Sequence, residues 1–251
     1  MLDKKCVLVI LITGVITQIN LGAVQIIPWD CTTHDRILDI VQKYLPQNPV
    51  IVEAGAFDGA DSVKMAELWP RGSVHAFEPD PLNFIKLKRK TSFNNNIYCY
   101  PLALSNKNGT ALFYQSEDPD NPDNAQSGSL LTPKEHLNYS NVIFSNGFEV
   151  ITMTLDAWAQ ENNVKQVDLL WLDTQGTELD IVKAAPNVLK KVKAIYTEVE
   201  FVEAYEGQAL YNEVRCWLED QGFVLIATNF NDSDKTRWYG DILMVRKEII
   251  A

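Results

Sequence analysis

Residues 50–59, Val-Ile-Val-Glu-Ala-Gly-Ala-Phe-Asp-Gly, decide the fold of this 251-residue chain. An apolar run ends in Glu53, two glycines at Gly55 and Gly59 bracket a tight turn, and a helical pattern follows. A second apolar run then ends in another acid, Glu78. The order of strand, glycine turn, helix, strand and acid is typical of a fold that holds an adenosine-containing cofactor.

The residues inside the turn indicate which cofactor it is. A dinucleotide fingerprint, Gly-x-Gly-x-x-Gly, has a middle glycine that lets the backbone approach a pyrophosphate. Here Ala56, Phe57 and Asp58 separate the glycines, and the last two side chains would crowd and repel a diphosphate. An acid at Glu53 suits a ligand with an ammonium group, and Glu78 can accept hydrogen bonds from both hydroxyls of a ribose. These features favour S-adenosylmethionine over NAD.

A glycine turn of this kind also occurs as an ordinary connection between a strand and a helix, without any ligand. The position of Glu78 favours the functional interpretation. An acid at the carboxyl end of a parallel strand lies in the crevice where open α/β sheets bind ligands.

Composition narrows the classes of function. The formal net charge of −11 provides no basic footprint for DNA or RNA, so we expect no nucleic-acid partner. The 3 histidines are scattered and the 4 cysteines form no Cys-x-x-Cys pair, so we expect no metal site. A chain of this length can bury one sizeable core.

The N-terminal stretch differs from the rest of the chain. After the fifth residue no charge appears until Asp30, and the strongly apolar part, residues 6–17, has the length of a signal-peptide core rather than of a bilayer span. We therefore expect residues 1–29 to target or anchor the protein and residues 30–251 to form the folded domain. Membrane association through residues 6–27, facing the cytoplasm where S-adenosylmethionine is made, is the favoured location. Export after cleavage and a buried N-terminal helix or strand are the alternatives.

Short apolar runs alternate with helical patterns along the remaining chain. We expect strands at 49–54, 74–78, 97–101, 110–115, 148–153, 167–173, 193–200, 223–228 and 241–246, and helices at 33–45, 60–69, 81–92, 154–162, 177–185 and 208–220. This alternation favours a doubly wound α/β sheet with an antiparallel pair at its end. Residues 116–147 show no period, so they form either a lid or substrate wall, or a disordered surface insertion.

A second group of acids follows the later strands. Asp173 ends an apolar strand, so its carboxylate should emerge at the same sheet edge as Glu53 and Glu78. Glu198 and Glu200 lie near the end of the next strand. We expect only one of the two to point into a shared pocket and favour Glu198.

Five segments of the chain resemble, in order, those of FkbM-type methyltransferases, a branch of the S-adenosylmethionine-dependent class I enzymes. They are Val-Glu-Ala-Gly-Ala-Phe-Asp-Gly, Ala-Phe-Glu-Pro-Asp-Pro, Pro-Leu-Ala-Leu-Ser-Asn, Asp-Leu-Leu-Trp-Leu-Asp-Thr-Gln-Gly-Thr-Glu-Leu and Gly-Asp-Ile-Leu-Met-Val. The resemblance implies a Rossmann-like sheet of about seven strands with one antiparallel strand. It also implies O-methylation of a hydroxyl on a small molecule or glycan.

The resemblance assigns roles to these positions. The residues that would bind the cofactor are Glu53, Gly55, Ala56, Phe57, Gly59, Glu78, Leu102 and Ala103. Within this set the glycine turn and its acid would hold the methionine end, Glu78 would hold the ribose, and the last two residues would lie near the adenine. Asp173 would face the transferred methyl group and could accept the proton of the acceptor hydroxyl.

Two positions depart from the family pattern, which usually has Lys where Trp171 stands and Glu where Gln175 stands. The missing acid weakens the case for a metal-assisted mechanism, and we expect Trp171 to pack in the core. Two alternatives therefore stay open. One is an NAD-dependent oxidoreductase, and the other is a non-catalytic binding module on the same fold.

Overall fold

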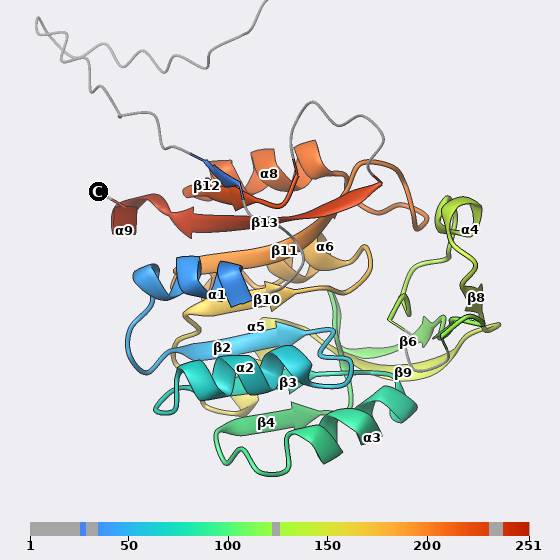
Figure 1. Ribbon diagram of the computed structural model, residues 1–251, viewed down its shortest axis with the longest axis horizontal. Helices are drawn as coiled ribbons and strands as arrows, with labels where there is room; N and C mark the ends of the chain where they lie inside the picture. The colour runs from blue at the N-terminus through green and yellow to red at the C-terminus, as the bar shows by residue number, and fades with distance from the viewer. Residues whose placement is uncertain (1–25, 29–34, 122–125, 231–237, 251) are drawn as a thin grey trace, which may run out of the picture.

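The computed structural model describes residues 26–28, 35–121, 126–230 and 238–250. A central sheet of eight strands has the order β1-β12-β13-β11-β10-β2-β3-β4 (Figure 1). Its strands are β1 (Ile27–Pro28), β2 (Val50–Ala54), β3 (Ser73–Phe77), β4 (Ile97–Tyr100), β10 (Leu169–Leu172), β11 (Ala194–Glu200), β12 (Phe223–Thr228) and β13 (Tyr239–Arg246). Only β13 runs antiparallel to its neighbours in this sheet. The expected doubly wound sheet of seven strands with one antiparallel strand is confirmed, and the two-residue β1 is added at its edge.

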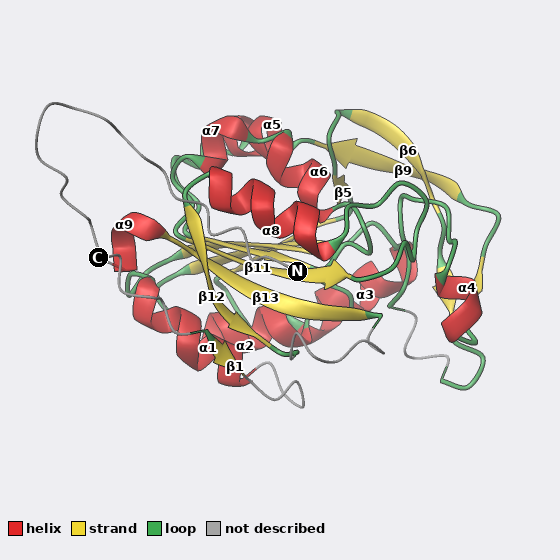
Figure 2. Cartoon of the chain, turned by 90° about the horizontal axis from the view of Figure 1, so that it is seen from above, coloured by secondary structure: helices red, strands yellow, loops and turns green. Residues whose placement is uncertain are grey.

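Helices cover both faces of the sheet (Figure 2). One face carries α1 (Asp35–Val41), α2 (Ala60–Leu68) and α3 (Pro81–Lys90), and the other carries α5 (Leu155–Glu161), α6 (Glu178–Lys183), α7 (Pro186–Leu189) and α8 (Tyr211–Asp220). Strand β10 shows why the sequence folds this way, because all four of its residues are buried. Leu170 and Leu172 pack into the core under α5–α8, and Leu169 and Trp171 pack into the core under α1 and α2. A continuous apolar run of this kind is what a parallel strand covered on both faces requires.

Helix α3 begins at a strong capping sequence beside the sheet edge. Asp80 is its N-cap, and its Oδ1 accepts hydrogen bonds from the backbone N–H of Leu82 at 2.7 Å and of Asn83 at 3.3 Å. Pro81 occupies the first helical position, where its missing N–H costs nothing. The cap holds the start of α3 directly after Glu78.

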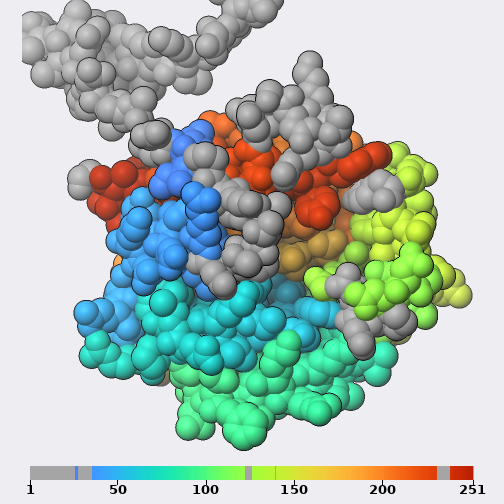
Figure 3. All heavy atoms as spheres, viewed as in Figure 1, coloured from blue at the N-terminus to red at the C-terminus, as the bar shows by residue number. Residues whose placement is uncertain are grey.

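A smaller sheet lies beside the carboxyl ends of the central strands (Figure 1). It contains β5 (Ala103–Leu104), β9 (Phe148–Met153) and β6 (Gly109–Phe113), in that order. The stretch 116–147, which shows no period in the sequence, contains β7 (Ser116–Glu117), α4 (His136–Tyr139) and β8 (Ile143–Phe144), and β7 pairs with β8. In the space-filling view the yellow-green atoms of this region cover one end of the molecule (Figure 3).

The expected membrane location is corrected by the helices that the structure describes. None of them is long and apolar enough to cross a bilayer, which takes about 20 residues. Residues 1–25, on which the expected anchor or cleaved signal mostly falls, lie outside the described residues. Ile27 belongs to β1 and pairs in parallel with Ala227 of β12. The division of the chain at residue 30 stays a prediction.

The two remaining helical segments are short. A 3-10 turn, η1 (Gln42–Tyr44), continues α1, and α9 (Lys247–Ile250) follows β13. Both lie at the amino ends of the central parallel strands, away from the region where β5, β6 and β9 meet the sheet (Figure 1).

Candidate active site

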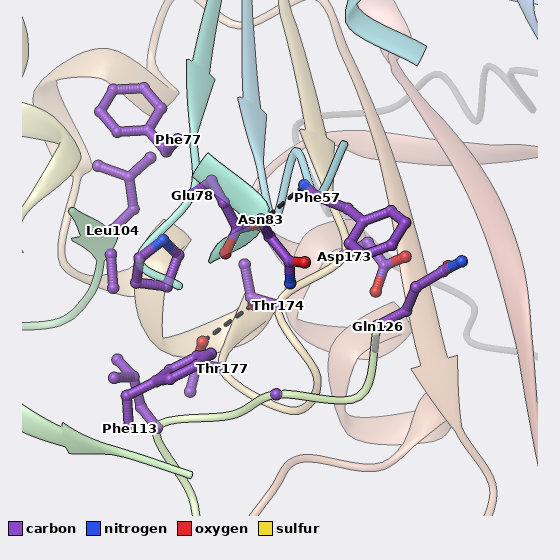
Figure 4. Close-up of a pocket in the computed structure, with 15 residues that line it drawn as sticks. Phe57, Phe77, Glu78, Asn83, Leu104, Phe113, Gln126, Asp173, Thr174 and Thr177 are labelled. Atoms are coloured by element: carbon purple, nitrogen blue, oxygen red, sulfur yellow. Dashed lines mark hydrogen bonds between the residues drawn. The ribbon is translucent and has the colours of Figure 1, made fainter. Parts of the chain in front are cut away.

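A cavity opens where the carboxyl ends of β2, β3 and β10 meet the smaller sheet. It contains about 620 Å³ of empty space, part of which is open to solvent. Five of the predicted site residues line it, namely Gly55, Phe57, Glu78, Ala103 and Asp173 (Figure 4). The edge that the sequence indicated as the ligand crevice is therefore hollow in the structure.

The glycine turn allows two strands to approach closely. Gly55 has a φ of +83°, and a Cβ atom added to it would lie 1.7 Å from the carbonyl oxygen of Asp173. The backbone N–H of Gly55 and that of Ala56 both donate to the carbonyl of Phe77, at 3.0 and 2.9 Å. Only glycine satisfies both the positive φ and the contact with β10. The turn thereby brings the backbone of Asp173 against the end of β2.

Glu78 is held at the cavity by two backbone donors. Its Oε2 accepts from the N–H of Phe57 at 2.8 Å, and its Oε1 accepts from the N–H of Asp80 at 2.8 Å. Burial raises the pKa of Glu78 to about 8, although both of these hydrogen bonds act to lower it. Each carboxyl oxygen can accept a further hydrogen bond, so the group can receive the two hydroxyls of a ribose.

Glu53 points elsewhere. Its side chain is 2% exposed, and its Oε2 accepts a hydrogen bond from the hydroxyl of Ser62 in α2. Burial raises the pKa of Glu53 well above its ordinary value, and the charge of Asp61 raises it further. Glu53 is not among the residues that line the cavity, and its expected contact with the methionine end stays a prediction.

Three more predicted residues lie behind the cavity surface. Ala56 packs with Ala76 and Leu87, and a Cβ atom on Gly59 would lie 2.7 Å from a methyl group of that same leucine. Leu102 packs against the large core under α5–α8. None of the three is among the residues that line the cavity.

Glu178 organises the turn after β10. Its Oε1 accepts from the backbone N–H of Thr174 at 2.7 Å and from the hydroxyl of the same residue at 3.0 Å. Its Oε2 accepts from the N–H of Gly176 at 3.1 Å. Burial raises the pKa of Glu178. This carboxyl therefore shapes the turn that carries Asp173, rather than facing the cavity itself.

The two departures from the family pattern have different surroundings. Trp171 is buried and stacks on Tyr196 of the neighbouring strand, with ring centroids 3.8 Å apart, so its expected place in the core is confirmed. Gln175 lies at the sheet edge, where its Nε2 donates to Asp173 Oδ1 at 2.8 Å and to Glu198 Oε2 at 2.7 Å.

Neither Glu198 nor Glu200 is among the residues that line the cavity, so the expectation that one of them, preferably Glu198, points into it is not met. The premise that the two side chains lie on opposite faces of the strand is also wrong. Residues two apart in a strand share a face of the sheet, and both belong to β11. Burial raises the pKa of both carboxyls, that of Glu200 to about 9. Within the described residues, no group of three or more His, Cys, Asp or Glu side chains is arranged to hold a metal ion.

One wall of the cavity comes from the stretch without sequence period. Gln126, Gly128 and Leu130 line it, together with Phe113 of β6. These residues form part of a cavity wall, and the role of that wall towards a substrate stays a prediction. Phe113 had no signal in the sequence because it reaches the cavity only through the smaller sheet. Other lining residues that were missed, Leu104, Thr174 and Thr177, directly follow or closely neighbour predicted ones.

Comparison with known proteins identifies the family. Residues 53–225 match the family described as the methyltransferase FkbM domain, a span that includes every predicted cofactor-binding residue and Asp173. The chain belongs to the FkbM methyltransferase family. The resemblance inferred from its motifs is thereby confirmed, and methyl transfer is its activity. The match does not support the NAD-dependent oxidoreductase alternative.

Two relatives named as methyltransferases each align with most of the chain. The 2-O-methyltransferase NoeI of Sinorhizobium fredii is 34% identical over 177 residues, which cover 70% of this chain and 72% of that protein. The methyltransferase sdnD of Sordaria araneosa is 26% identical over 233 residues, which cover 82% of this chain and 83% of that protein. Among solved structures, the precorrin-6y C5,15-methyltransferase of Geobacter metallireducens is a loose match with 13% identity and a TM-score of 0.48, covering 86% of this chain and 89% of that one.

Proposed function

We propose that this protein transfers the methyl group of S-adenosylmethionine to a hydroxyl of a small molecule or glycan. The observation that carries the proposal is the cavity at Gly55, Glu78 and Asp173. Among the described residues that line it are two acids and no Lys, Arg or His, which disfavours a phosphate-bearing ligand and suits a cationic one. The name of the relative NoeI, a 2-O-methyltransferase, supports an oxygen acceptor.

We assign each part of the cofactor to residues that line the cavity. Glu78 would accept the ribose hydroxyls, and the apolar side chains of Phe77, Ala103 and Leu104 offer a surface for the adenine. Gly55, which has no side chain, would let the methionine end pass close to the backbone. In this arrangement the positively charged end would lie near Asp173.

Asp173 is the residue that would act on the acceptor. Bound S-adenosylmethionine supplies an electrophilic methyl group on a sulfonium. The Asp173 carboxylate would orient the acceptor hydroxyl and accept its proton as the methyl group is transferred and S-adenosylhomocysteine leaves. Most of the rate acceleration would come from holding the acceptor oxygen in line with the methyl group. The wall at Gln126, Gly128 and Leu130 would hold the acceptor in this position.

The acceptor is expected to be small or to present a free sugar. The net charge of −11 supports an acceptor other than a nucleic acid. The wall at Gln126 combines an amide with the apolar Leu130, a mixture suited to a molecule that has both hydroxyls and carbon faces.

Calorimetric titration tests the cofactor assignment. S-adenosylhomocysteine should bind the wild-type protein more tightly than NAD does. Glu78→Gln should weaken its binding by about 2- to 10-fold, because the amide nitrogen cannot accept a ribose hydroxyl and a hydrogen bond is worth about 0.5–1.5 kcal/mol. Glu149→Gln, in which an exposed glutamate of β9 is changed, is the control and should bind normally. Equal binding to Glu78→Gln and wild type would refute the assignment.

Radiolabelled methyl transfer tests the acceptor class. The panel contains methyl glycosides of the common hexoses, pentoses and 6-deoxyhexoses, together with small hydroxylated acids. Transfer to a hydroxyl of at least one member is expected. Tight cofactor binding without transfer to any member would instead support the non-catalytic binding module.

A further inference from the structure

Gln175 stands between two carboxyl groups, and its amide can have only one orientation there. Its Nε2 lies 2.8 Å from Asp173 Oδ1 and 2.7 Å from Glu198 Oε2. An amide nitrogen carries two protons, so each carboxyl oxygen receives one. The reversed amide would place its oxygen against two acceptors. The glutamine therefore donates to both acids at once, which a glutamate at this position could not do.

The other end of the same amide is tied to the cavity wall. The hydroxyl of Tyr205 has one proton and shares it between two acceptors, Gln175 Oε1 at 2.9 Å and the carbonyl oxygen of Ser127 at 2.8 Å. The ring of Tyr205 is fully buried. The hydroxyl of Ser129 donates to the backbone carbonyl of Gln175 at 2.7 Å. These two serines flank Gly128, which lines the cavity.

The backbone of Gln175 is held in a conformation that a glutamine rarely adopts. Its φ is +57°, in the left-handed region. Such a residue keeps this conformation only when its surroundings impose it, and residues of this kind concentrate at functional sites. Here the imposing contacts are the ones to Asp173, Glu198, Tyr205 and Ser129.

The two acids that share the amide differ in their surroundings. Asp173 lines the cavity and Glu198 does not. Burial raises the pKa of Glu198 well above its ordinary value, and the charge of Asp173 raises it further. Burial therefore disfavours a charge on Glu198, whose Oε2 accepts one amide hydrogen while Oδ1 of Asp173 accepts the other.

We propose that Gln175 is a positioning residue that aims the Asp173 carboxylate into the cavity and joins it, through Tyr205, to the wall segment 127–129. The proton-accepting group and the wall that faces the acceptor would then move as one hydrogen-bonded unit. The inference rests on the proposed function only for the role of Asp173 as proton acceptor.

The bridge itself is tested by NMR of the ¹⁵N-labelled protein, which needs no acceptor. The side-chain amide pair of Gln175 is identified as the pair that disappears in Gln175→Glu. Both of its protons should lie downfield and exchange slowly with solvent. Asp173→Asn should move one of the two resonances, and Glu198→Gln should move the other. A pair that exchanges rapidly and ignores both changes would overturn the proposal.

The link to the wall is tested by hydrogen exchange. Tyr205→Phe removes the hydroxyl that bonds to this segment. The backbone amide hydrogens of residues 126–130 should then exchange about ten-fold faster, because the free energy needed to open the segment falls. Tyr98→Phe is the matched control, since Tyr98 lies half exposed on the edge strand β4. Ser129→Ala should give the same result and serves if the buried tyrosine variant does not fold. Unchanged exchange in both Tyr205→Phe and Ser129→Ala would refute the link.

Kinetics separate positioning from a merely structural role. With the methyl glycoside that wild type turns over fastest, Gln175→Glu should lower kcat on the order of 10²-fold, the usual size of a contribution from an aimed acid or base. The Kd of S-adenosylhomocysteine should stay within about two-fold, and so should the KM of the cofactor. Equal losses in kcat and in cofactor affinity would contradict positioning. If wild type binds no S-adenosylhomocysteine, the proposed function fails, while the NMR and exchange results still decide the bridge and the link.

Discussion

Under the proposed function the cavity has a cofactor half, at Gly55 and Glu78, and an acceptor half, at Asp173 and residues 126–130. The two halves are built in different ways. In the cofactor half, Gly55 and Glu78 lie close together in the sequence, and the hydrogen bond from Phe57 to Glu78 spans 21 residues. In the acceptor half, the bond from Ser129 to Gln175 spans 46 residues and the bond from Tyr205 to Ser127 spans 78. The first half is a local motif, and the second is an assembly of distant segments.

The two halves also fix their acids by different means. Backbone N–H groups hold Glu78 in the cofactor half. A side-chain amide, that of Gln175, holds Asp173 in the acceptor half. Backbone donors are present whatever the side chains are, whereas a side-chain donor is lost by a single substitution. The cofactor half should therefore tolerate substitutions nearby, and the acceptor half should change its specificity through them.

The largest expected effect comes from Gly55→Ala, where the two halves touch. The added Cβ would lie 1.7 Å from the carbonyl oxygen of Asp173, and the φ of +83° is unfavourable for alanine. We expect a loss of roughly 4 kcal/mol or more in the free energy of unfolding, together with loss of cofactor binding. Urea denaturation and calorimetry measure the two effects.

Gly207→Ala is the matched control for that change. Its φ is +77°, but nothing lies within 4 Å of the added Cβ. The cost should be only the roughly 1–2 kcal/mol of a left-handed alanine. Similar losses in the two variants would show that the contact between the halves contributes little.

Asp173→Asn should abolish most activity without affecting the cofactor half. Loss of the proton acceptor is expected to lower kcat by about 10²- to 10⁴-fold. The affinity for S-adenosylhomocysteine should change little, because Glu78 and the glycine turn remain. Radiolabelled transfer and calorimetry on the same preparation separate the two outcomes. A large drop in cofactor affinity would mean that the halves are not independent.

Glu78→Gln should change how stability depends on pH. The pKa of Glu78 is raised to about 8 by burial, whereas in the unfolded chain it titrates near its ordinary value. The folded state therefore binds the extra proton, and wild-type stability falls as the pH rises from about 4.5 towards 8.

Glutamine does not titrate, so the free energy of unfolding of Glu78→Gln should not show this fall. Relative to wild type, it should rise by a few kcal/mol between pH 5 and pH 8. Urea denaturation of both proteins at pH 5, 6.5 and 8 checks this sign. Glu149→Gln, on the exposed face of β9, should run parallel to wild type at all three values. A constant difference between Glu78→Gln and wild type would contradict the raised pKa.

The smallest effect is expected at the wall. Gln126→Ala removes one polar contact with the acceptor, and a hydrogen bond is typically worth about 0.5–1.5 kcal/mol, so the acceptor KM should rise by roughly 2- to 10-fold. Cofactor affinity should not change. Gln160→Ala, on an exposed position of α5, is the control. A changed cofactor affinity in Gln126→Ala would contradict the assignment of Gln126 to the acceptor half.

The sequence alone determined the central sheet, the glycine turn and the places of Glu78 and Asp173 at its edge. These features depend on the period of apolar residues and on backbone geometry within one strand–turn–helix unit, and both are properties of neighbouring residues. Glu53 shows what such local patterns cannot predict. Its position at the end of β2 was evident, but its contact with Ser62 depends on how α2 packs.

Only the tertiary structure decided the acceptor half. Nothing in the string of residues places Phe113 or Leu130 at the cavity, because a smaller sheet has to fold first and bring them there. Gln175 looked in the sequence like the loss of an acid. In the structure it donates to two acids at once, because packing brings Asp173 and Glu198 to opposite sides of one amide. A local motif depends on neighbouring residues and can be predicted from their order. A contact between distant residues depends on how the helices and strands pack, so it is visible only in the folded chain.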